Sequence, residues 1–189
     1  MTNASENPFA EERLGRLPFH FPAGDGWEAL LGRLAAQRWR GAIVGPAGTG
    51  KTALIEQLAP HLEAKGFCPK IFTFRSEHTF AEKQATLSEI ITATAPDFLL
   101  VDGADQLPTR NWLSVTNAGA SCAGLVITQN RGGRLPTILS CEANATLLDS
   151  LVFELTEAWL PEGEASRLLA RYHGNVRECL RDLHNRYAG

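Results

Sequence analysis

Short apolar runs recur along the chain and alternate with stretches in which apolar residues follow the spacing of a helix. The runs predict five strands, at residues 41–45, 70–74, 98–102, 124–128 and 136–140. The stretches with helical spacing predict helices over residues 26–38, 51–65, 80–94 and 108–118. In the helix over residues 80–94 we expect Ile90 and Ile91 both to face inward.

This alternation predicts an α/β fold in which helices sandwich a mostly parallel five-stranded sheet. We expect the run 136–140 at the sheet edge, because Pro136 cannot donate to a neighbouring strand and fits only at a strand start. This α/β core is expected to span residues 26–142.

The remaining segments differ from this core. After residue 142 the chain shows three apolar stripes at helical spacing, which begin at Leu148, Leu168 and Val176 and predict a small C-terminal helical lid over residues 143–189. For residues 1–25 the sequence shows no clear periodicity, and we predict an N-terminal arm there. Its aromatic residues are expected to pack against the rest of the protein; they are Phe9, Phe19 and Phe21.

A glycine-rich loop lies between the first predicted strand and the next helix. It reads Gly45, Pro46, Ala47, Gly48, Thr49, Gly50, Lys51 and Thr52, which fits Gly-x-x-x-x-Gly-Lys-Ser/Thr at every fixed position. Glycines let backbone N–H groups wrap a phosphate, and the following helix adds its dipole. Lys51 supplies charge to the β- and γ-phosphates, and Thr52 offers a hydroxyl to Mg²⁺. The motif predicts a P-loop NTPase that binds ATP and Mg²⁺.

Asp102 ends the apolar run 98–102, at the carboxyl end of a predicted buried strand. Ligands of open α/β sheets bind at that edge. A carboxylate there can hold magnesium together with Thr52. The alternative is an ordinary aspartate that opens a turn.

Composition narrows the function classes. Eighteen basic against 21 acidic residues give a net charge of −3, so broad coating of nucleic acid is not indicated. No apolar run reaches the roughly 18 residues that a membrane helix needs, and the first residues lack the pattern of a secretory signal. The four cysteines lack metal-ligand spacing, which favours reduced thiols in a cytoplasmic protein.

The two motifs and the helical tail resemble an AAA+-type (additional-strand) P-loop ATPase over roughly residues 40–186. In that family a glutamate that orients the attacking water usually follows the magnesium aspartate, and here Gly103 stands in its place. The resemblance therefore implies slow hydrolysis with a substitute base. The candidates are Asp105, Glu77 and His78, each of which could instead be a capping or solvated residue.

The resemblance also implies roles for residues after the fourth strand and in the lid. Asn130 would sense the γ-phosphate, with Thr128 and Gln129 as weaker candidates. Arg131 and Arg134 are candidates to reach a neighbouring subunit's nucleotide. Arg177, in Gly174-Asn175-Val176-Arg177, would fold down onto the nucleotide from the lid. The catalytic candidates are Lys51, Asp102, Asp105, Asn130 and Arg177.

Three functions compete at this point. The first is an ATP-binding protein with slow Mg²⁺-dependent hydrolysis, which couples its nucleotide state to lid movement and to a macromolecular partner, in a single copy or a homo-oligomer. The second is a small-molecule kinase, for which Arg131 and Arg134 could cover the phosphates. The third is a nucleotide-gated binding module without hydrolysis, which Gly103 supports.

Overall fold

The computed structural model describes residues 7–188 and divides into two compact units. The first, called here the sheet unit, consists of Phe21–Gly45 and Lys51–Ser140. The second, called the helical unit, consists of the residues up to His20, the loop Pro46–Gly50 and the residues from Cys141 onward. The helical unit is therefore assembled from three separate stretches of the sequence.

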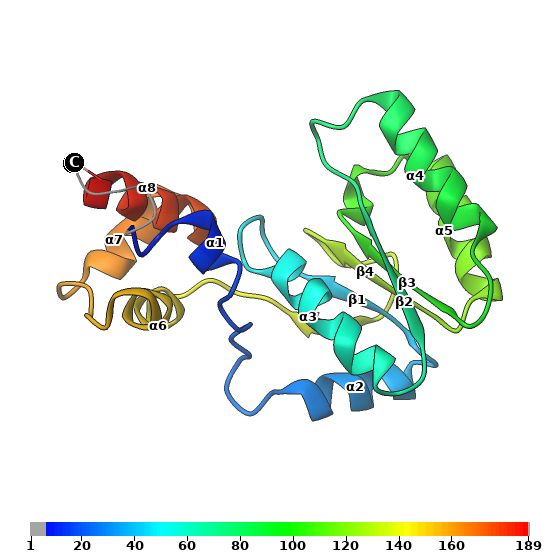
Figure 1. The fold of residues 1–189 in the computed structure, drawn as a ribbon, viewed down its shortest axis with the longest axis horizontal. Helices are drawn as coiled ribbons and strands as arrows, with labels where there is room; N and C mark the ends of the chain where they lie inside the picture. Colours follow the sequence, from blue (N-terminus) through cyan, green and yellow to red (C-terminus); the bar gives the residue numbers. More distant parts are fainter. Residues whose placement is uncertain (1–6, 189) are drawn as a thin grey trace. The chain divides into compact units, whose positions relative to one another are not determined.

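The sheet unit contains five strands in the order β2-β3-β4-β1-β5, and all neighbouring strands run parallel (Figure 1). They are β1 (Arg40–Val44), β2 (Cys68–Thr73), β3 (Asp97–Asp102), β4 (Gly124–Gln129) and β5 (Thr137–Ser140). The five-stranded parallel sheet is confirmed, and so is the position of the last strand at an edge. Pro136 precedes β5 and does not interrupt its pairing with β1.

Helices cover both faces of this sheet (Figure 1). The helices α2 (Trp27–Ala36) and α3 (Lys51–Glu63) pack on one face, and α4 (Phe80–Thr92) and α5 (Thr109–Ser121) pack on the other. A short 3₁₀ helix, η2 (Ala104–Gln106), follows β3. Gly66 has a φ of +86° just after α3, as expected for a glycine that ends a helix.

The prediction for α4 was wrong at one residue. Ile90 is fully buried, but Ile91 is 52% exposed. α4 packs on β2, the edge strand, and on α5, so it has a covering element along only part of its circumference. Successive helix residues point about 100° apart, and Ile91 therefore lies outside the buried stripe that Leu87 and Ile90 form.

The core of the sheet unit depends on large side chains that meet small ones. Phe98 on β3 is fully buried, and its ring packs edge-on against Trp39 and Phe67 at centroid distances of 6.3 and 5.3 Å. The neighbouring strand leaves room for this ring at Gly124, where an added Cβ would lie 2.2 Å from the Phe98 ring. A side chain at residue 124 would therefore displace the fully buried ring of Phe98.

The helical unit has its own apolar core. Its helices are α1 (Glu11–Leu14), α6 (Ala145–Thr156), α7 (Glu164–Arg171) and α8 (Val176–Ala188). Buried residues of the last three pack together with Phe9 from the N-terminal arm. The arm is also held by a hydrogen bond from Asn7 Nδ2 to the carbonyl oxygen of His184, 3.0 Å long. The arm thus belongs with the lid helices, although Phe21 packs on Trp27 within the sheet unit.

Within residues 7–188, none of the helices combines the length and the apolar character that a membrane crossing requires.

We predict that Gly124→Ala lowers the free energy of unfolding by about 1–3 kcal/mol, because the new methyl group would overlap the Phe98 ring. Chemical denaturation measures this change. The control is Gly32→Ala on the exposed side of α2, where no atom lies within 4 Å of the added Cβ. That variant should be more stable by about 0.5–1 kcal/mol, since alanine favours a helix. A neutral Gly124→Ala would contradict the packing described here.

Candidate functional site

The loop between β1 and α3 has the backbone conformation that its glycines predict. Gly48 and Gly50 have φ values of +78° and +84°, in the region that side chains other than glycine rarely adopt. Thr49 closes the loop from within, since its hydroxyl donates to the carbonyl oxygen of Pro46 over 2.9 Å. The loop leads directly into α3, which begins at Lys51, so the N–H groups of a helix N-terminus follow it.

Two residues of the helical unit approach this loop. A Cβ on Gly48 would lie 1.8 Å from Asn175 Oδ1, at the start of α8. A Cβ on Gly50 would lie 3.4 Å from the Phe19 ring of the arm. Gly48 is therefore required both by its backbone conformation and by the close approach of Asn175. The beginning of α8 and the phosphate-loop backbone contact each other directly.

In the sheet unit, Asp102 is the centre of a hydrogen-bond network. Thr52 donates its hydroxyl to Asp102 Oδ2 over 2.8 Å, and Thr128 donates its hydroxyl to Asp102 Oδ1. The Thr128 hydroxyl in turn accepts from the backbone N–H of Gly103 at 2.8 Å. Asp102 is only 8% exposed, and this network compensates for the burial of its carboxylate.

The two residues that the sequence suggests for magnesium are therefore in direct contact. Thr52 and Asp102 offer a hydroxyl and a carboxylate, the oxygen ligands that Mg²⁺ prefers. Among residues 7–188 no group of three or more His, Cys, Asp or Glu side chains could hold a metal by itself. The residues present thus fit Mg²⁺ that takes its other ligands from phosphates and water.

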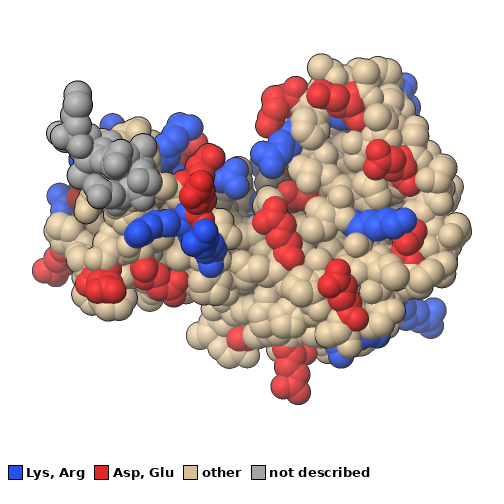
Figure 2. All heavy atoms as spheres, in the orientation of Figure 1, with Lys and Arg blue, Asp and Glu red and all other residues tan. Residues whose placement is uncertain are grey.

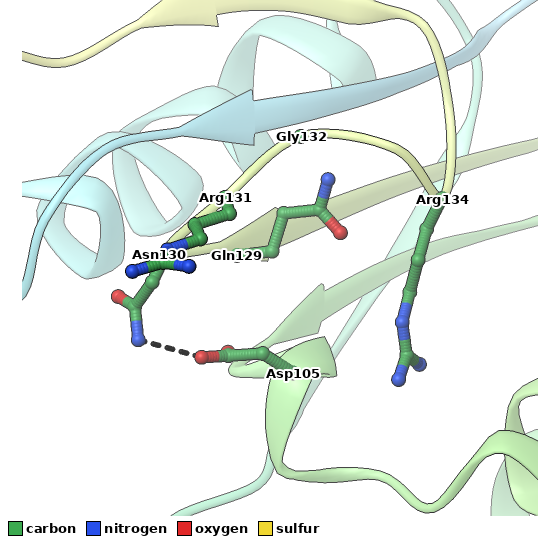
Figure 3. Close-up of a pocket in the computed structure, with 6 residues that line it drawn as sticks. All are labelled: Asp105, Gln129, Asn130, Arg131, Gly132 and Arg134. Atoms are coloured by element: carbon green, nitrogen blue, oxygen red, sulfur yellow. Dashed lines mark hydrogen bonds between the residues drawn. The ribbon is translucent and has the colours of Figure 1, made fainter.

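A second chain of contacts links the lysine of the loop to the end of β4. Lys51 Nζ donates to the carbonyl oxygen of Gly45 at 2.6 Å and lies 3.3 Å from Asn130 Oδ1. Asn130 Nδ2 donates to Asp105 Oδ2 at 2.6 Å, the bond drawn in Figure 3. The amide of Asn130 therefore connects the cation of Lys51 with the carboxylate of Asp105.

The structure gives a physical reason for glycine at residue 103. Gly103 has a φ of +76°, and an added Cβ would lie 2.1 Å from the backbone oxygen of Phe74. That oxygen cannot move aside easily, because it belongs to the chain directly after the strand β2. A glutamate at residue 103 is therefore excluded by both backbone strain and collision.

The three substitute bases lie in different surroundings. Asp105 is exposed in η2 and contacts Asn130. Glu77 accepts from the Ser76 hydroxyl at 3.1 Å, and hydrogen bonds from its own backbone and from Ser76 hold its pKa below the ordinary value. His78 Nδ1 accepts from the backbone N–H of Arg75 at 3.3 Å. Glu77 and His78 are thus occupied within their own turn, and Asp105 is the carboxylate linked to Lys51 through Asn130.

The candidate arginines have separate positions. Arg134 is directed inward: Nη2 donates to the carbonyl oxygen of Leu107 at 2.9 Å, and its guanidinium lies 5.0 Å from the Trp112 ring centroid. Arg131 is exposed. Arg177 is exposed on α8 in the helical unit, whereas Arg181 one turn later pairs with Glu178.

Two residues have roles that the sequence did not indicate. The Thr128 hydroxyl bonds to Asp102, whereas the family resemblance suggests Thr128 only as a γ-phosphate sensor. Gln129 is 2% exposed, and its Nε2 has no hydrogen-bond partner. The strand register explains the contact of Thr128 with Asp102: Val101 pairs with Ile127, so the residues that follow them on β3 and β4 lie side by side.

Charged side chains are mixed on the face of the molecule that Figure 2 shows. On the face in Figure 2, acidic and basic side chains of the described residues are interspersed among other residues, and no continuous basic area is visible there. This distribution agrees with the small net charge of −3.

Residues 42–130 match the sequence model of the family "ATPase family associated with various cellular activities (AAA)". This range contains the whole loop motif, residues 45–52, and the residues Asp102, Asp105 and Asn130. Comparison with curated protein sequences gives no match.

Solved structures with a similar fold include replication initiators. One is the replication initiator DnaA bound to AMPPCP and single-stranded DNA, with a TM-score of 0.56 and 14% identity over 84% of this chain and 58% of that one. Another is AMPPCP-bound DnaA from Aquifex aeolicus, with a TM-score of 0.52 and 15% identity over 84% of this chain and 61% of that one. A third, described as a DNA replication initiation factor, has a TM-score of 0.52 and 14% identity over 82% and 58% of the two chains.

The chain thus spans about three fifths of the length of these proteins, and at this level of identity the likeness shows the fold. Residues 42–130 match the AAA family model, and the five-stranded parallel sheet with its flanking helices has the fold of AAA+-type P-loop ATPases.

Proposed function

We propose that this protein binds ATP with Mg²⁺ and hydrolyses it slowly, and that its lid helices respond to the bound nucleotide. The observation that carries the proposal is the contact of Thr52 with Asp102, 2.8 Å apart, beside the chain from Lys51 through Asn130 to Asp105. These side chains come from four elements or their ends, and each has the chemistry that its place beside a triphosphate requires.

The proposal assigns a separate role in phosphate or magnesium binding to each residue of the site. Backbone N–H groups of residues 45–52 hold the phosphates, and Lys51 directs its charge to the β- and γ-phosphate oxygens. Thr52 and Asp102 would hold Mg²⁺, which when bound neutralises charge on the β- and γ-phosphates. Thr128 fixes the rotamer of Asp102 through its hydroxyl. Asn130 can donate to a γ-phosphate oxygen if its bond to Asp105 is exchanged.

Asp105 is the base that we propose for hydrolysis. Its carboxylate is exposed, so a water can reach it, and Asn130 places it on the Lys51 side of the sheet edge. A carboxylate in η2, three residues after Asp102, replaces the glutamate for which residue 103 has no room. A base offset in this way should align water less well than one directly after the strand, which is the reason for slow turnover.

The contact between Asn175 and Gly48 supports coupling to the lid. Both residues lie in the helical unit, and Asn175 also accepts from the N–H of Glu178 at 3.3 Å, at the first turn of α8. A phosphate that reshapes the loop around Gly48 would therefore act on the start of α8. Arg177 on that turn is the residue that we propose to meet the γ-phosphate.

We also propose a macromolecular partner. Slow hydrolysis together with a lid that responds to nucleotide suits a protein whose binding to another macromolecule is controlled by ATP. Two structural neighbours bind AMPPCP and one of them single-stranded DNA, according to their descriptions. We propose a cytoplasmic location. The described cysteines form no disulfide, and burial raises the pKa of Cys122 and Cys179, which disfavours their reactive thiolate forms.

Gly103 also supports a second function, a nucleotide-gated binding module without hydrolysis. The geometry that excludes a side chain at residue 103 removes the family's usual base. Tight ATP binding with no phosphate release, in the free protein and with added partners, would establish this second function in place of the first.

We predict that Lys51→Ala weakens Mg²⁺·ATP binding at least about tenfold, because a charge-assisted contact to the phosphates is lost. Isothermal titration calorimetry measures the affinity. Lys65→Ala, after α3 and outside the loop, is the matched control and should bind like the parent. Equal affinities for all three proteins would overturn the phosphate-loop assignment.

We expect Asp105→Asn to slow single-turnover hydrolysis by about 10²-fold or more, the usual contribution of a positioned base. Asparagine keeps an oxygen that can accept from Asn130, so ATP affinity should change little. Glu77→Gln is the control and should keep the parent rate, since Glu77 bonds within its own turn. If Glu77→Gln is the slower variant, the base has been assigned to the wrong strand end.

Arg177→Ala should reduce the preference for ATP over ADP about tenfold or more, because the lost contact is made only to the γ-phosphate. Calorimetry with each nucleotide gives the ratio. The control is Arg167→Ala on α7, an exposed arginine of the same unit that pairs with Glu164. An unchanged ratio of ATP to ADP affinity in Arg177→Ala would show that Arg177 makes no contact with the γ-phosphate and is an ordinary exposed residue of α8.

A further inference from the structure

Two aromatic side chains are exposed at the end of α6 in the helical unit. Phe153 is 39% exposed and Trp159 is 64% exposed, and their rings stack with centroids 4.5 Å apart. Leu155 and Leu160, close to them in the sequence, pack against the apolar core of the unit. The stacked rings, called here the aromatic pair, therefore lie outside a core that their neighbours have joined. Exposed tryptophan and phenylalanine rings are typical of interaction surfaces.

The turn after α6 holds the aromatic pair in place. Glu157 ends the helix with a φ of +56°, which residues other than glycine rarely adopt. Its backbone N–H donates to the carbonyl oxygen of Phe153 at 2.8 Å, and the hydroxyl of Thr156 accepts from the N–H of Ala158 at 3.2 Å. The chain turns back here, and Trp159 stacks on Phe153. Because the ring is already ordered, binding to it would cost little conformational entropy.

The helix that carries the aromatic pair is acidic. From residue 144 to residue 157 the chain contains no Lys or Arg, and its acidic residues there are Asp149, Glu154 and Glu157. Asp149 lies one helical turn before Phe153 and on the same face of α6. Figure 2 shows acidic side chains over α6. The aromatic pair thus lies beside negative charge.

These carboxylates are not neutralised as those of the other lid helices are. On α7 and α8, arginines pair with acidic residues, as Arg186 does with Glu164 at 2.8 Å. On α6, Glu154 contacts His20 at 3.0 Å. Asp149 and Glu157 form no ion pair with any residue in the range 7–188. Their charge is therefore available to a cation from outside the chain.

Aromatic faces beside unpaired carboxylates select the chemistry of a partner. Nucleic acid and anionic lipid surfaces are disfavoured, because both carry negative charge. An arginine suits both features, since its planar guanidinium stacks on an indole ring and pairs with carboxylates. Apolar residues next to that arginine would cover the remaining ring surface.

We propose that the aromatic pair and the carboxylates of Asp149 and Glu157 bind a basic, partly apolar segment of a partner protein, with an arginine of that segment stacked on Trp159. This proposal rests on the macromolecular partner of the proposed function and names its chemistry. The surface itself requires no nucleotide. Asn175, which approaches the phosphate loop at Gly48, belongs to the same helical unit, so nucleotide could act on this surface through the lid.

The test is a fluorescence-anisotropy titration of a labelled peptide with the nucleotide-free protein. The peptide is an amphipathic helix of about 15 residues, built from arginine, leucine and alanine. Binding should saturate and should weaken as the salt concentration rises. A peptide with glutamate in place of arginine should not bind.

Trp159→Ala should raise the dissociation constant for the arginine peptide at least about tenfold, and Trp159→Phe, which keeps an aromatic face, should raise it less. Leu113→Ala on α5 is the matched control, because it removes a side chain that is 61% exposed in the other unit. Glu157→Gln should raise the constant about threefold, whereas Glu56→Gln on α3 should not change it.

No saturable binding, or equal binding of the glutamate peptide, would overturn the proposal. So would parent-like binding by Trp159→Ala, or tighter binding of single-stranded DNA or anionic vesicles than of the arginine peptide. Self-association of the parent that Trp159→Ala abolishes would assign the surface to a second copy and overturn the choice of partner. A calorimetric ATP titration separates the two proposals. Peptide binding without ATP binding would refute the nucleotide site alone, and ATP binding without peptide binding would refute this surface alone.

Discussion

The parallel register of β1, β3 and β4 places every residue of the candidate site that lies in the sheet unit. Val44 pairs with Gln129 and Val101 with Ile127, so the three strands end at the same edge. The loop leaves β1 there, Asp102 ends β3, and Asn130 follows β4. A shift of one residue in any pairing would turn these side chains to the opposite face of the sheet. The chemistry of the site therefore depends on the packing that fixes the register, and the close fit of Phe98 against Gly124 is one part of that packing.

Burial of Asp102 explains much of the local sequence around it. A carboxylate taken out of water is tolerated only when donors replace the lost hydration. Thr52 and Thr128 supply two hydroxyls, and Thr128 in turn receives the N–H of Gly103. The bond from Gly103 goes with a left-handed turn, and in that turn the Phe74 oxygen fills the space of a side chain. The glycine at residue 103 is thus part of how this chain holds the buried carboxylate of Asp102.

The loop motif, the five strands and the edge position of β5 could be predicted from the sequence, because each follows from a short local pattern. The turn at Gly103 could not, since it depends on the close approach of Phe74, which lies directly after the strand β2. Ile91 has the spacing of a core residue, and only the position of α4 over the edge strand exposes it. Likewise, the bond from Asn130 to Asp105 joins residues 25 apart. The spacing of apolar residues predicts which side chains could be buried, but the packing of neighbouring elements determines which of them are buried.

The position of the N-terminal arm has a consequence for how the chain folds as it is synthesised. Asn7 bonds to a residue 177 positions later, and Phe9 packs in the core that α6, α7 and α8 form. When the arm leaves the ribosome its partners do not yet exist, whereas residues 21–140 contain a complete sheet. Long-range contacts form late because a large loop must close first. The sheet unit is therefore expected to fold first during translation, and the arm waits as an exposed apolar segment until the last helix emerges.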